Sequence, residues 1–215
     1  MAIGLSVLLV LPLRWLPPLT SSFMLQSYAN SGQFYAYRWR SYGDISPYMA
    51  LAAIAAEDQR FPKHQGFDLR ELERAIEDYQ EGEALRGAST ISQQVAKNLY
   101  LWSEQTIARK AIEAWLTVLI EAFWSKQRIL EVYLNIAQFD EHTFGVESAS
   151  WHFFDRPAAD LSPEEAALLA AVLPGPELYD AAQPSLEVLQ RQAWILQQMN
   201  QLGGLDYLTQ LQTPN

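Results

Sequence analysis

Apolar residues recur at helical spacing along most of the chain and predict one helix after another. Within residues 106–124 the apolar positions lie three or four apart on one face: Ile112, Leu116, Leu119, Ile120 and Phe123. Ser46 followed by Pro47 marks the start of an alanine-rich helix, which brings Glu57 close to its end. These patterns predict a mainly α fold.

Polar capping residues mark the starts of further helices. A side-chain oxygen at such a position accepts a hydrogen bond from the first turn, and a Glu three residues later completes a capping box. The starts predicted in this way are at Asp68 with Glu71, Ser125, Ser162 with Glu165, and Ser185. Residues 19–44 lack this regularity, so we expect an irregular N-terminal arm there, followed by one domain over residues 45–215.

The N-terminus is apolar from Ala2 to Leu13. A helix that crosses a bilayer needs about 20 such residues, so this stretch is too short alone. Arg14 and Trp15 follow it, and both suit a membrane–water interface. We expect residues 1–18 to be the end of a single-pass membrane anchor whose beginning is missing. An apolar helix docked on the domain is the alternative.

Composition and charge narrow the chemistry. The 215 residues include no cysteine, which excludes disulfides, thiolate metal sites and cysteine nucleophiles. The net charge is -10, without a run of Lys and Arg, so we expect no nucleic-acid partner. Residues 84–130 nevertheless hold six basic and three acidic side chains, a net +3 that leaves -13 for the rest. Local cations in this segment can therefore attract an anion to an acidic protein.

Acidic side chains gather in residues 57–68, directly after the alanine-rich helix. This segment holds three carboxylates and a histidine around a glycine: Glu57, Asp58, His64, Gly66 and Asp68. A carboxylate at the end of a helix can accept a proton from a substrate hydroxyl. The alternatives are a solvated glutamate and a histidine in a structural or substrate-orienting role. The cluster indicates acid–base chemistry.

A second polar segment spans residues 87–98 and combines hydroxyls, amides and an ammonium: Ser89, Thr90, Gln94, Lys97 and Asn98. If residues 91–100 form a helix, Gln94 and Lys97 lie three apart on one face, with Asn98 beside them. One groove would then collect all three for a phosphate or a sugar. For the two hydroxyls, capping of the helix start is an equal alternative.

A third group consists of Arg109, Lys110 and Glu113, in which the cations lie four and three residues before the carboxylate. These spacings allow ion pairs along one helix, worth roughly a few tenths of a kcal/mol each when exposed. The same pairs would keep Glu113 ionised and oriented beside a ligand, so a structural and a functional role are compatible.

These segments, in this order, resemble the motifs of the peptidoglycan glycosyltransferases, glycosyltransferase family 51, and within it the monofunctional biosynthetic transglycosylases. The resemblance covers about residues 45–176 and runs through six segments: 57–68, 87–98, 109–113, 126–135, 144–147 and 164–170. It implies a lysozyme-like globular lobe with a smaller membrane-proximal lobe. It also implies polymerisation of lipid II into glycan strands, with inversion at the sugar carbon and release of undecaprenyl pyrophosphate, in cell wall biogenesis.

The resemblance implies roles for individual residues. Glu57 takes the place of the catalytic base. Glu113 lies near the pyrophosphate of the donor, where a divalent cation, Mg²⁺ or Mn²⁺, is a candidate ligand. The implied substrate-binding residues are Asp58, His64, Ser89, Thr90, Gln94, Lys97, Asn98, Arg109 and Lys110. The implied partners are lipid II, the growing glycan chain and the membrane, with the domain on the periplasmic side of a bacterial inner membrane.

The chain departs from the family pattern at Gln105, where many relatives carry an arginine eight residues after Lys97. One phosphate-binding cation is then missing, and Arg86 or Arg109 is its candidate substitute. Two other interpretations stay open: a lysozyme-like hydrolase, which also uses paired carboxylates, and a non-catalytic glycan or division-complex binding module. The set of Gln94, Lys97 and Arg109 favours a pyrophosphate substrate over neutral sugars.

Overall fold

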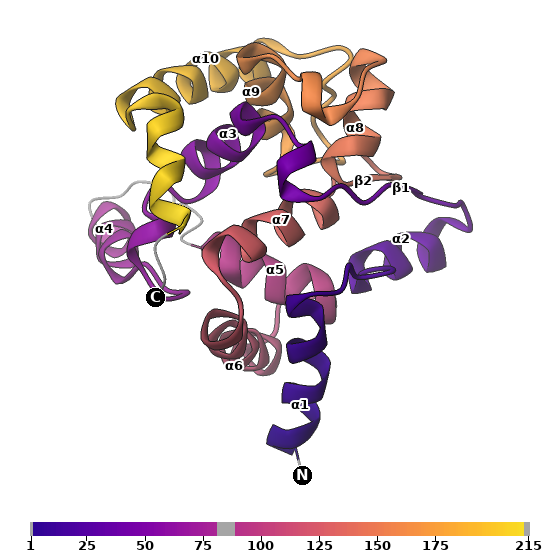
Figure 1. Ribbon diagram of the computed structural model, residues 1–215, viewed down its shortest axis with the longest axis vertical. Helices are drawn as coiled ribbons and strands as arrows, with labels where there is room; N and C mark the ends of the chain where they lie inside the picture. Colours follow the sequence, from indigo (N-terminus) through magenta and orange to yellow (C-terminus); the bar gives the residue numbers. More distant parts are fainter. Residues whose placement is uncertain (1, 81–88, 213–215) are drawn as a thin grey trace.

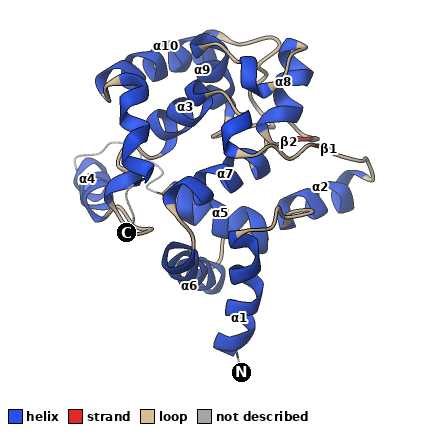
Figure 2. Cartoon of the chain, in the orientation of Figure 1, coloured by secondary structure: helices blue, strands red, loops and turns tan. Residues whose placement is uncertain are grey.

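Helices make up almost all of the regular structure (Figures 1 and 2), which confirms the predicted mainly α fold. The computed structural model describes residues 2–80 and 89–212. Its helices and strands, in chain order, are α1 (Ala2–Val10), α2 (Ser22–Ser31), β1 (Ala36–Tyr37), α3 (Pro47–Glu57), α4 (Leu69–Gln80), α5 (Ile91–Tyr100), α6 (Ile107–Phe123), α7 (Lys126–Ile136), β2 (Thr143–Phe144), α8 (Val146–Phe154), α9 (Pro163–Val172) and α10 (Leu186–Gln201), with short 3₁₀ turns between several of them. Arg86 lies outside the described residues.

Helix α3 lies in the core, packed against α9 and α10 (Figure 1). Every residue from Met49 to Ala55 is buried. A helix that is apolar all round is a core helix, and the alanines of α3 and α9 let the two backbones approach closely. A second group is formed by α5, which packs against α6 and α7. The end of α3 and the start of α5 meet where these two groups adjoin.

The predicted helix starts are confirmed by side-chain caps. Each capping oxygen accepts a backbone N–H from the first turn: Asp68 from Glu71, Ser125 from Arg128, Ser162 from Glu165, and Ser185 from Val188. Ser46 differs, because its hydroxyl donates to the carbonyl oxygen of Leu161 at 2.8 Å. Pro47, with its fixed φ, therefore sets the start of α3 without a side-chain cap.

Residues 19–44 are more regular than predicted. Ser21 caps α2 by accepting the N–H of Met24 at 3.2 Å, and Gly32 ends the helix in the left-handed conformation (φ 71°). Strand β1 then pairs in parallel with β2, with Ala36 opposite Thr143. Met24 is the buried residue of α2, so the helix has almost no apolar stripe from which to recognise it.

The predicted membrane anchor is not borne out. Helix α1 has nine residues, which give about 14 Å of helix against a hydrocarbon core of about 30 Å. Pro12 stands in the 3₁₀ turn Leu11–Arg14 that ends the α-helical geometry. No helix within residues 2–80 or 89–212 is both long and apolar enough to cross a bilayer. The prediction of a single-pass inner-membrane anchor over residues 1–18 is therefore wrong.

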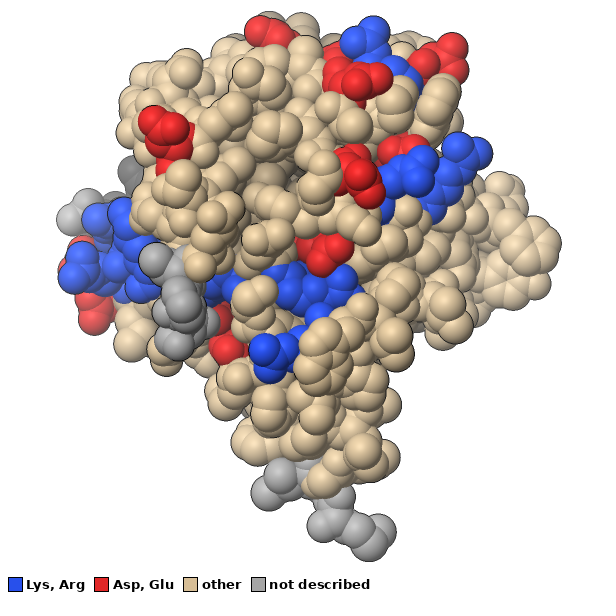
Figure 3. All heavy atoms as spheres, viewed as in Figure 1, with Lys and Arg blue, Asp and Glu red and all other residues tan. Residues whose placement is uncertain are grey.

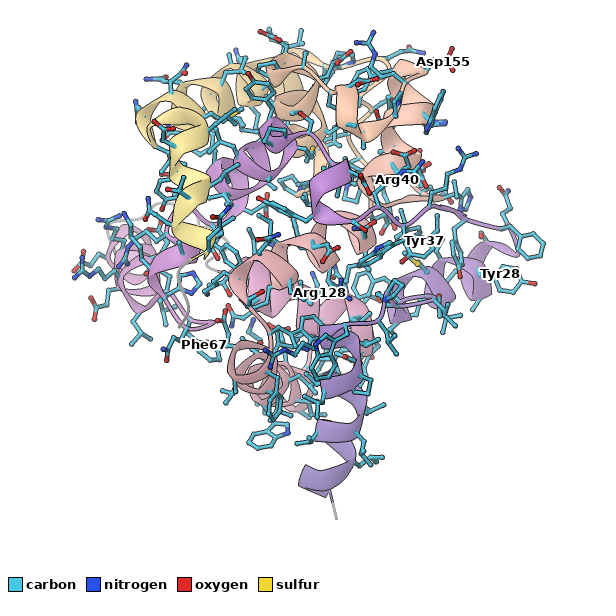
Figure 4. The ribbon with its side chains drawn as sticks, in the orientation of Figure 1. Tyr28, Tyr37, Arg40, Phe67, Arg128 and Asp155 are labelled. Atoms are coloured by element: carbon cyan, nitrogen blue, oxygen red, sulfur yellow. The ribbon has the colours of Figure 1, made fainter. Side chains whose placement is uncertain are left out.

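The N-terminal segment is instead docked on the domain. The indole of Trp124 donates to the carbonyl oxygen of Val10 at 3.0 Å. Arg128, near the centre of Figure 4, donates to the carbonyl oxygens of Leu13 at 2.9 Å and Leu16 at 2.6 Å. Arg128 also pairs with Glu131 at 2.8 Å. One cation of the basic segment thus holds the N-terminal turn against α7.

Candidate active site

Glu57 is the last residue of α3, and its side chain is only 13% exposed. Gln94 Nε2 on α5 donates to Glu57 Oε2 at 2.8 Å, and Arg191 Nη2 on α10 lies 3.5 Å from Oε1. Burial raises the pKa of Glu57, while the Gln94 hydrogen bond and the charges of Arg191 and Lys97 oppose the rise. A carboxylate held in this way is suited to accept a proton.

Asp58 joins the first two polar segments. Its Oδ2 accepts the backbone N–H of Ile91, the first residue of α5, at 3.0 Å. The Nε2 of His64 lies 2.9 Å and 3.1 Å from its two oxygens. Both side chains are almost fully buried, at 3% and 6% exposure. Asp58 and His64 thus hold each other and the start of α5 in place, and their contact with a substrate stays a prediction.

Thr90 has the capping role that the sequence left open. Its hydroxyl accepts the N–H of Gln93, and Gln93 Oε1 accepts the N–H of Thr90 at 3.0 Å, which completes a capping box. The same hydroxyl donates to the carbonyl oxygen of Gly66 at 2.6 Å. Gly66 has φ 86°, and a Cβ there would lie 2.7 Å from Thr117. Ser89 is half-buried and has no hydrogen-bond partner in the described part of the chain.

Glu113 on α6 is buried and paired on both oxygens. Arg109 Nη1 donates to Oε2 at 2.8 Å, and Lys110 Nζ donates to Oε1 at 2.5 Å. Arg109 is buried with the carboxylate, whereas the side chain of Lys110 is 49% exposed. The predicted ion pairs at spacings of four and three residues are therefore present, and they orient a buried carboxylate.

Lys97 is coupled to both carboxylates. Burial lowers its pKa; Glu113 and Glu57 oppose this, whereas Arg109 and Lys110 add to it. Its Nζ stands 5.4 Å from the centre of the Phe23 ring on α2. No carboxylate of the described residues lies within 4.0 Å of Lys97. Its charge is therefore available to an anionic ligand.

Asn98 is placed differently from Lys97. It is buried at 8% exposure, and its Oδ1 has no hydrogen-bond partner among residues 2–80 and 89–212. Gln94 and Lys97 thus both interact with Glu57, while Asn98 lies in the interior, and a groove shared by the three stays a prediction.

Two residues of the site were missed by sequence reasoning. Arg191 belongs to α10, 134 residues after Glu57, and no motif marks it. Tyr133 on α7 is fully buried, as a packing residue would be. Its hydroxyl also donates to Gln94 Oε1 at 3.3 Å. Because the amide oxygen receives this bond, the amide NH₂ group is the part that faces Glu57.

The carboxylates do not form an obvious cation site. Both oxygens of Glu113 already accept hydrogen bonds from cationic side chains. Asp58, His64 and Asp68 lie close enough to one another to hold a metal ion. Within this cluster, however, His64 is bonded to Asp58, and Arg60 pairs with Asp68 at 2.5 Å. Glu113, the residue predicted to hold Mg²⁺ or Mn²⁺, therefore does not fit that role as it is arranged, because a cationic side chain is bonded to each of its oxygens.

Comparison with known proteins places this sequence in one family. The sequence profile described as Transglycosylase matches residues 26–200, which include every site residue named above. The chain belongs to the transglycosylase family. It is 50% identical over 211 residues to a biosynthetic peptidoglycan transglycosylase of Pseudomonas fluorescens, covering 96% of this chain and 88% of the relative. Similar proteins of the same name are found in Mannheimia succiniciproducens (52% identity; 97% and 88% covered) and Chromohalobacter salexigens (48%; 97% and 92%).

The family membership confirms the resemblance drawn from the motifs. The profile also begins within α2 and reaches Asn200, one residue before the end of α10. The transglycosylase domain therefore includes Arg191 and part of the segment predicted as an arm, in addition to residues 45–176. The roles of the single residues do not follow from this membership and stay predictions.

The hydrogen bond from Gln94 should be visible in the titration of Glu57. We expect Gln94→Leu to raise the pKa of Glu57 further, because leucine cannot donate to the ionised carboxylate. The pKa is measured by NMR on protein with ¹³C-labelled glutamate, and the Glu57 signal is identified by its loss in Glu57→Gln. Gln59→Leu, a neighbouring change that leaves this bond intact, is the control. An unchanged or lowered pKa in Gln94→Leu would contradict the prediction.

Proposed function

We propose that the protein is a peptidoglycan glycosyltransferase that polymerises lipid II into glycan strands and releases undecaprenyl pyrophosphate. One observation carries this proposal: a buried carboxylate with a raised pKa, Glu57, shares the charge of Lys97 with the cation-paired Glu113. A proton acceptor thus adjoins a group of cations. Joining sugars from a pyrophosphate-linked donor requires both.

In this mechanism Glu57 removes the proton from the acceptor sugar hydroxyl. The hydroxyl oxygen attacks the carbon of the donor sugar that carries the pyrophosphate, from the opposite face. A new carbon–oxygen bond forms as the bond to pyrophosphate breaks, so the configuration at that carbon inverts. The pyrophosphate leaves with the bonding electron pair, and Glu57 keeps the proton until solvent removes it. Atoms and charge are balanced without a further reactant.

The cations stabilise the charge that develops on the leaving group. Lys97 is half-buried and has no carboxylate within ion-pair distance in the described part of the chain, so a phosphate can take that place. Hydrogen bonds between charged groups in a partly dry site are stronger than bonds between neutral ones. Glu113 holds Arg109 and Lys110 beside Lys97 and limits their mutual repulsion.

The same pairing argues against the hydrolase alternative. A retaining or inverting hydrolase needs a second carboxyl group that is free to attack, to activate water or to donate a proton. Glu113 has neither oxygen free, because Arg109 and Lys110 occupy both. The mechanism needs no metal-dependent step.

We propose further that apolar side chains around the N-terminal segment touch the membrane in which a lipid-linked substrate resides. Large apolar side chains are exposed on this segment, among them Leu8 (70%), Trp15 (66%) and Leu16 (59%). The lower and right-hand parts of the face in Figure 3, over α1 and α2, carry few charged side chains. Exposed apolar patches of this kind mark interaction surfaces.

Loss of the base should abolish polymerisation. We expect Glu57→Gln to lower the rate of glycan formation from labelled lipid II by about 10² to 10⁴-fold, because the amide cannot accept a proton. Wild-type activity should fall as the pH falls through the raised pKa of Glu57, which lies above the ordinary value of 4.5. Gel analysis of the polymer measures both effects. Polymer formed by Glu57→Gln at near wild-type rate, with the fold intact by circular dichroism, would refute the assignment.

Loss of the central cation should weaken donor use. We expect Lys97→Ala to lower kcat/KM for lipid II by about 10 to 100-fold, the equivalent of one charge-assisted hydrogen bond. Lys97→Arg should lose much less, and the difference between the two variants should shrink at high salt. Arg156→Ala, which removes a cation that pairs with Glu165, is the control. Equal losses in Lys97→Ala and Lys97→Arg would indicate that Lys97 acts in packing.

Removal of the exposed apolar side chains should weaken membrane contact. We expect the double variant Trp15→Ser, Leu16→Ser to lower the fraction of protein that sediments with phospholipid vesicles several-fold, since less apolar surface enters the interface. The double variant Leu178→Ser, Leu186→Ser, which alters equally exposed leucines elsewhere, should bind like the wild type. Equal behaviour of the two double variants would overturn the proposed membrane surface.

A further inference from the structure

A cavity of about 920 Å³ is lined by residues in and beside α1, α2, α5 and α6, and it is not used by the mechanism above. Figure 1 shows the arrangement of these four helices. Its apolar lining includes Leu9 on α1, Leu25 on α2, Leu99 on α5, and Ile112 and Leu116 on α6. The size is within the range of about 300 to 1,000 Å³ that is typical of small-molecule sites. Leu9 (51% exposed) and Ile112 (42% exposed) keep the cavity open to the surface.

Most polar side-chain groups in the wall, with the exception of the Trp102 indole, are bonded within the protein. The indole of Trp115 donates to Ser6 Oγ at 3.1 Å, and the hydroxyl of Tyr100 donates to the carbonyl oxygen of Leu9 at 3.2 Å. The hydroxyl of Thr20 is bonded to that of Tyr35 at 2.9 Å. A polar ligand would have to break such bonds or lose its own bonds to water. The wall therefore suits a hydrocarbon.

The cavity adjoins the cations of the active site. Tyr100 and Leu116, which line the cavity, lie three residues after Lys97 and Glu113 on the same helices. Side chains three apart on a helix are neighbours. On α2, Phe23 contacts Lys97, and the adjacent Ser22 belongs to the cavity wall. A phosphate at Lys97 would thus have an apolar space one helical turn away along α5.

We propose that this cavity binds the first isoprene units of the polyisoprenyl chain that is attached to the pyrophosphate of the donor. This inference rests on the proposed function, because it takes the cations around Glu113 as the pyrophosphate site. The neighbouring charge selects the occupant. A polyisoprenyl diphosphate has its phosphate bonded directly to the apolar chain, whereas glycerol separates the phosphate of a phospholipid from its acyl chains.

Chain-length dependence of binding tests the proposal without turnover. Inorganic pyrophosphate, geranyl diphosphate and farnesyl diphosphate are titrated into the wild type and Glu57→Gln below the micellar concentration, with calorimetric detection. We expect the affinity to rise at least about tenfold from pyrophosphate to farnesyl diphosphate in both proteins, since each buried methylene adds to binding. Leu9→Gln and Ile112→Gln should lose most of this gain while their affinity for inorganic pyrophosphate is unchanged. The matched control is Leu8→Gln, on the same helix but outside the cavity wall, which should keep the gain.

Several outcomes would overturn the inference. Affinity that does not depend on chain length excludes a chain-binding cavity. Equal losses in Leu8→Gln and Leu9→Gln indicate a non-specific apolar surface. Binding of dihexanoyl phosphatidylglycerol as tightly as farnesyl diphosphate would indicate a site for bilayer lipids. A wild-type dimer that is lost only in Leu9→Gln, as measured by analytical sedimentation, would indicate that the cavity wall is a contact between two copies of the chain. Failure of the proposed function is separate: it appears as polymerisation that survives Glu57→Gln, and it leaves the chain-length result unaffected.

Discussion

The arrangement of the site depends on the buried carboxylate of Asp58, whose hydrogen bonds connect two helices. It accepts the backbone N–H of Ile91 and is bonded to the ring of His64, so it joins the end of α3 to the start of α5. An N–H in the first helical turn has no partner within its own helix, and negative charge is favoured there. Glu57 precedes Asp58 by one residue, and Gln94 follows Ile91 by three. One hydrogen-bonded carboxylate therefore sets the distance between the base and its amide partner.

The two functional carboxylates differ because their surroundings differ. Glu57 is buried with one neutral amide donor and a guanidinium at 3.5 Å, and burial outweighs both in raising its pKa. Glu113 is more deeply buried than Glu57, but it has a cation on each oxygen. The first arrangement favours uptake of a proton, whereas the second fixes an anion among cations. Lys97 is coupled to both, so a proton acceptor and an anion-binding site share one charge.

The features that could be predicted from the sequence are those that depend on interactions between residues a few positions apart in the chain. Caps at Asp68, Ser125, Ser162 and Ser185 follow from local chemistry, and the ion pairs of Glu113 follow from helical spacing. Contacts between distant segments leave no such signal. Arg191 reaches Glu57 across 134 residues, and nothing near it in the sequence indicates a site. Helix α2 buries too little apolar surface to be recognised from the sequence. The apolar run at residues 2–13 indicated a membrane anchor, but a proline-containing turn limits α1 to nine residues.

Residues 84–130 attract an anion less strongly than their number of basic side chains suggests, because most of these side chains are paired with carboxylates. Lys126 pairs with Glu121 at 2.8 Å in the interior, and Arg128 pairs with Glu131 while it holds the N-terminal turn. Arg109 and Lys110 share Glu113, so together they supply one net charge. Of the described cations in this segment, Lys97 alone has no ion pair within 4.0 Å. Pairing therefore leaves the attraction for an anion greatest at Lys97 on α5, where we propose that this acidic protein binds the pyrophosphate of its donor.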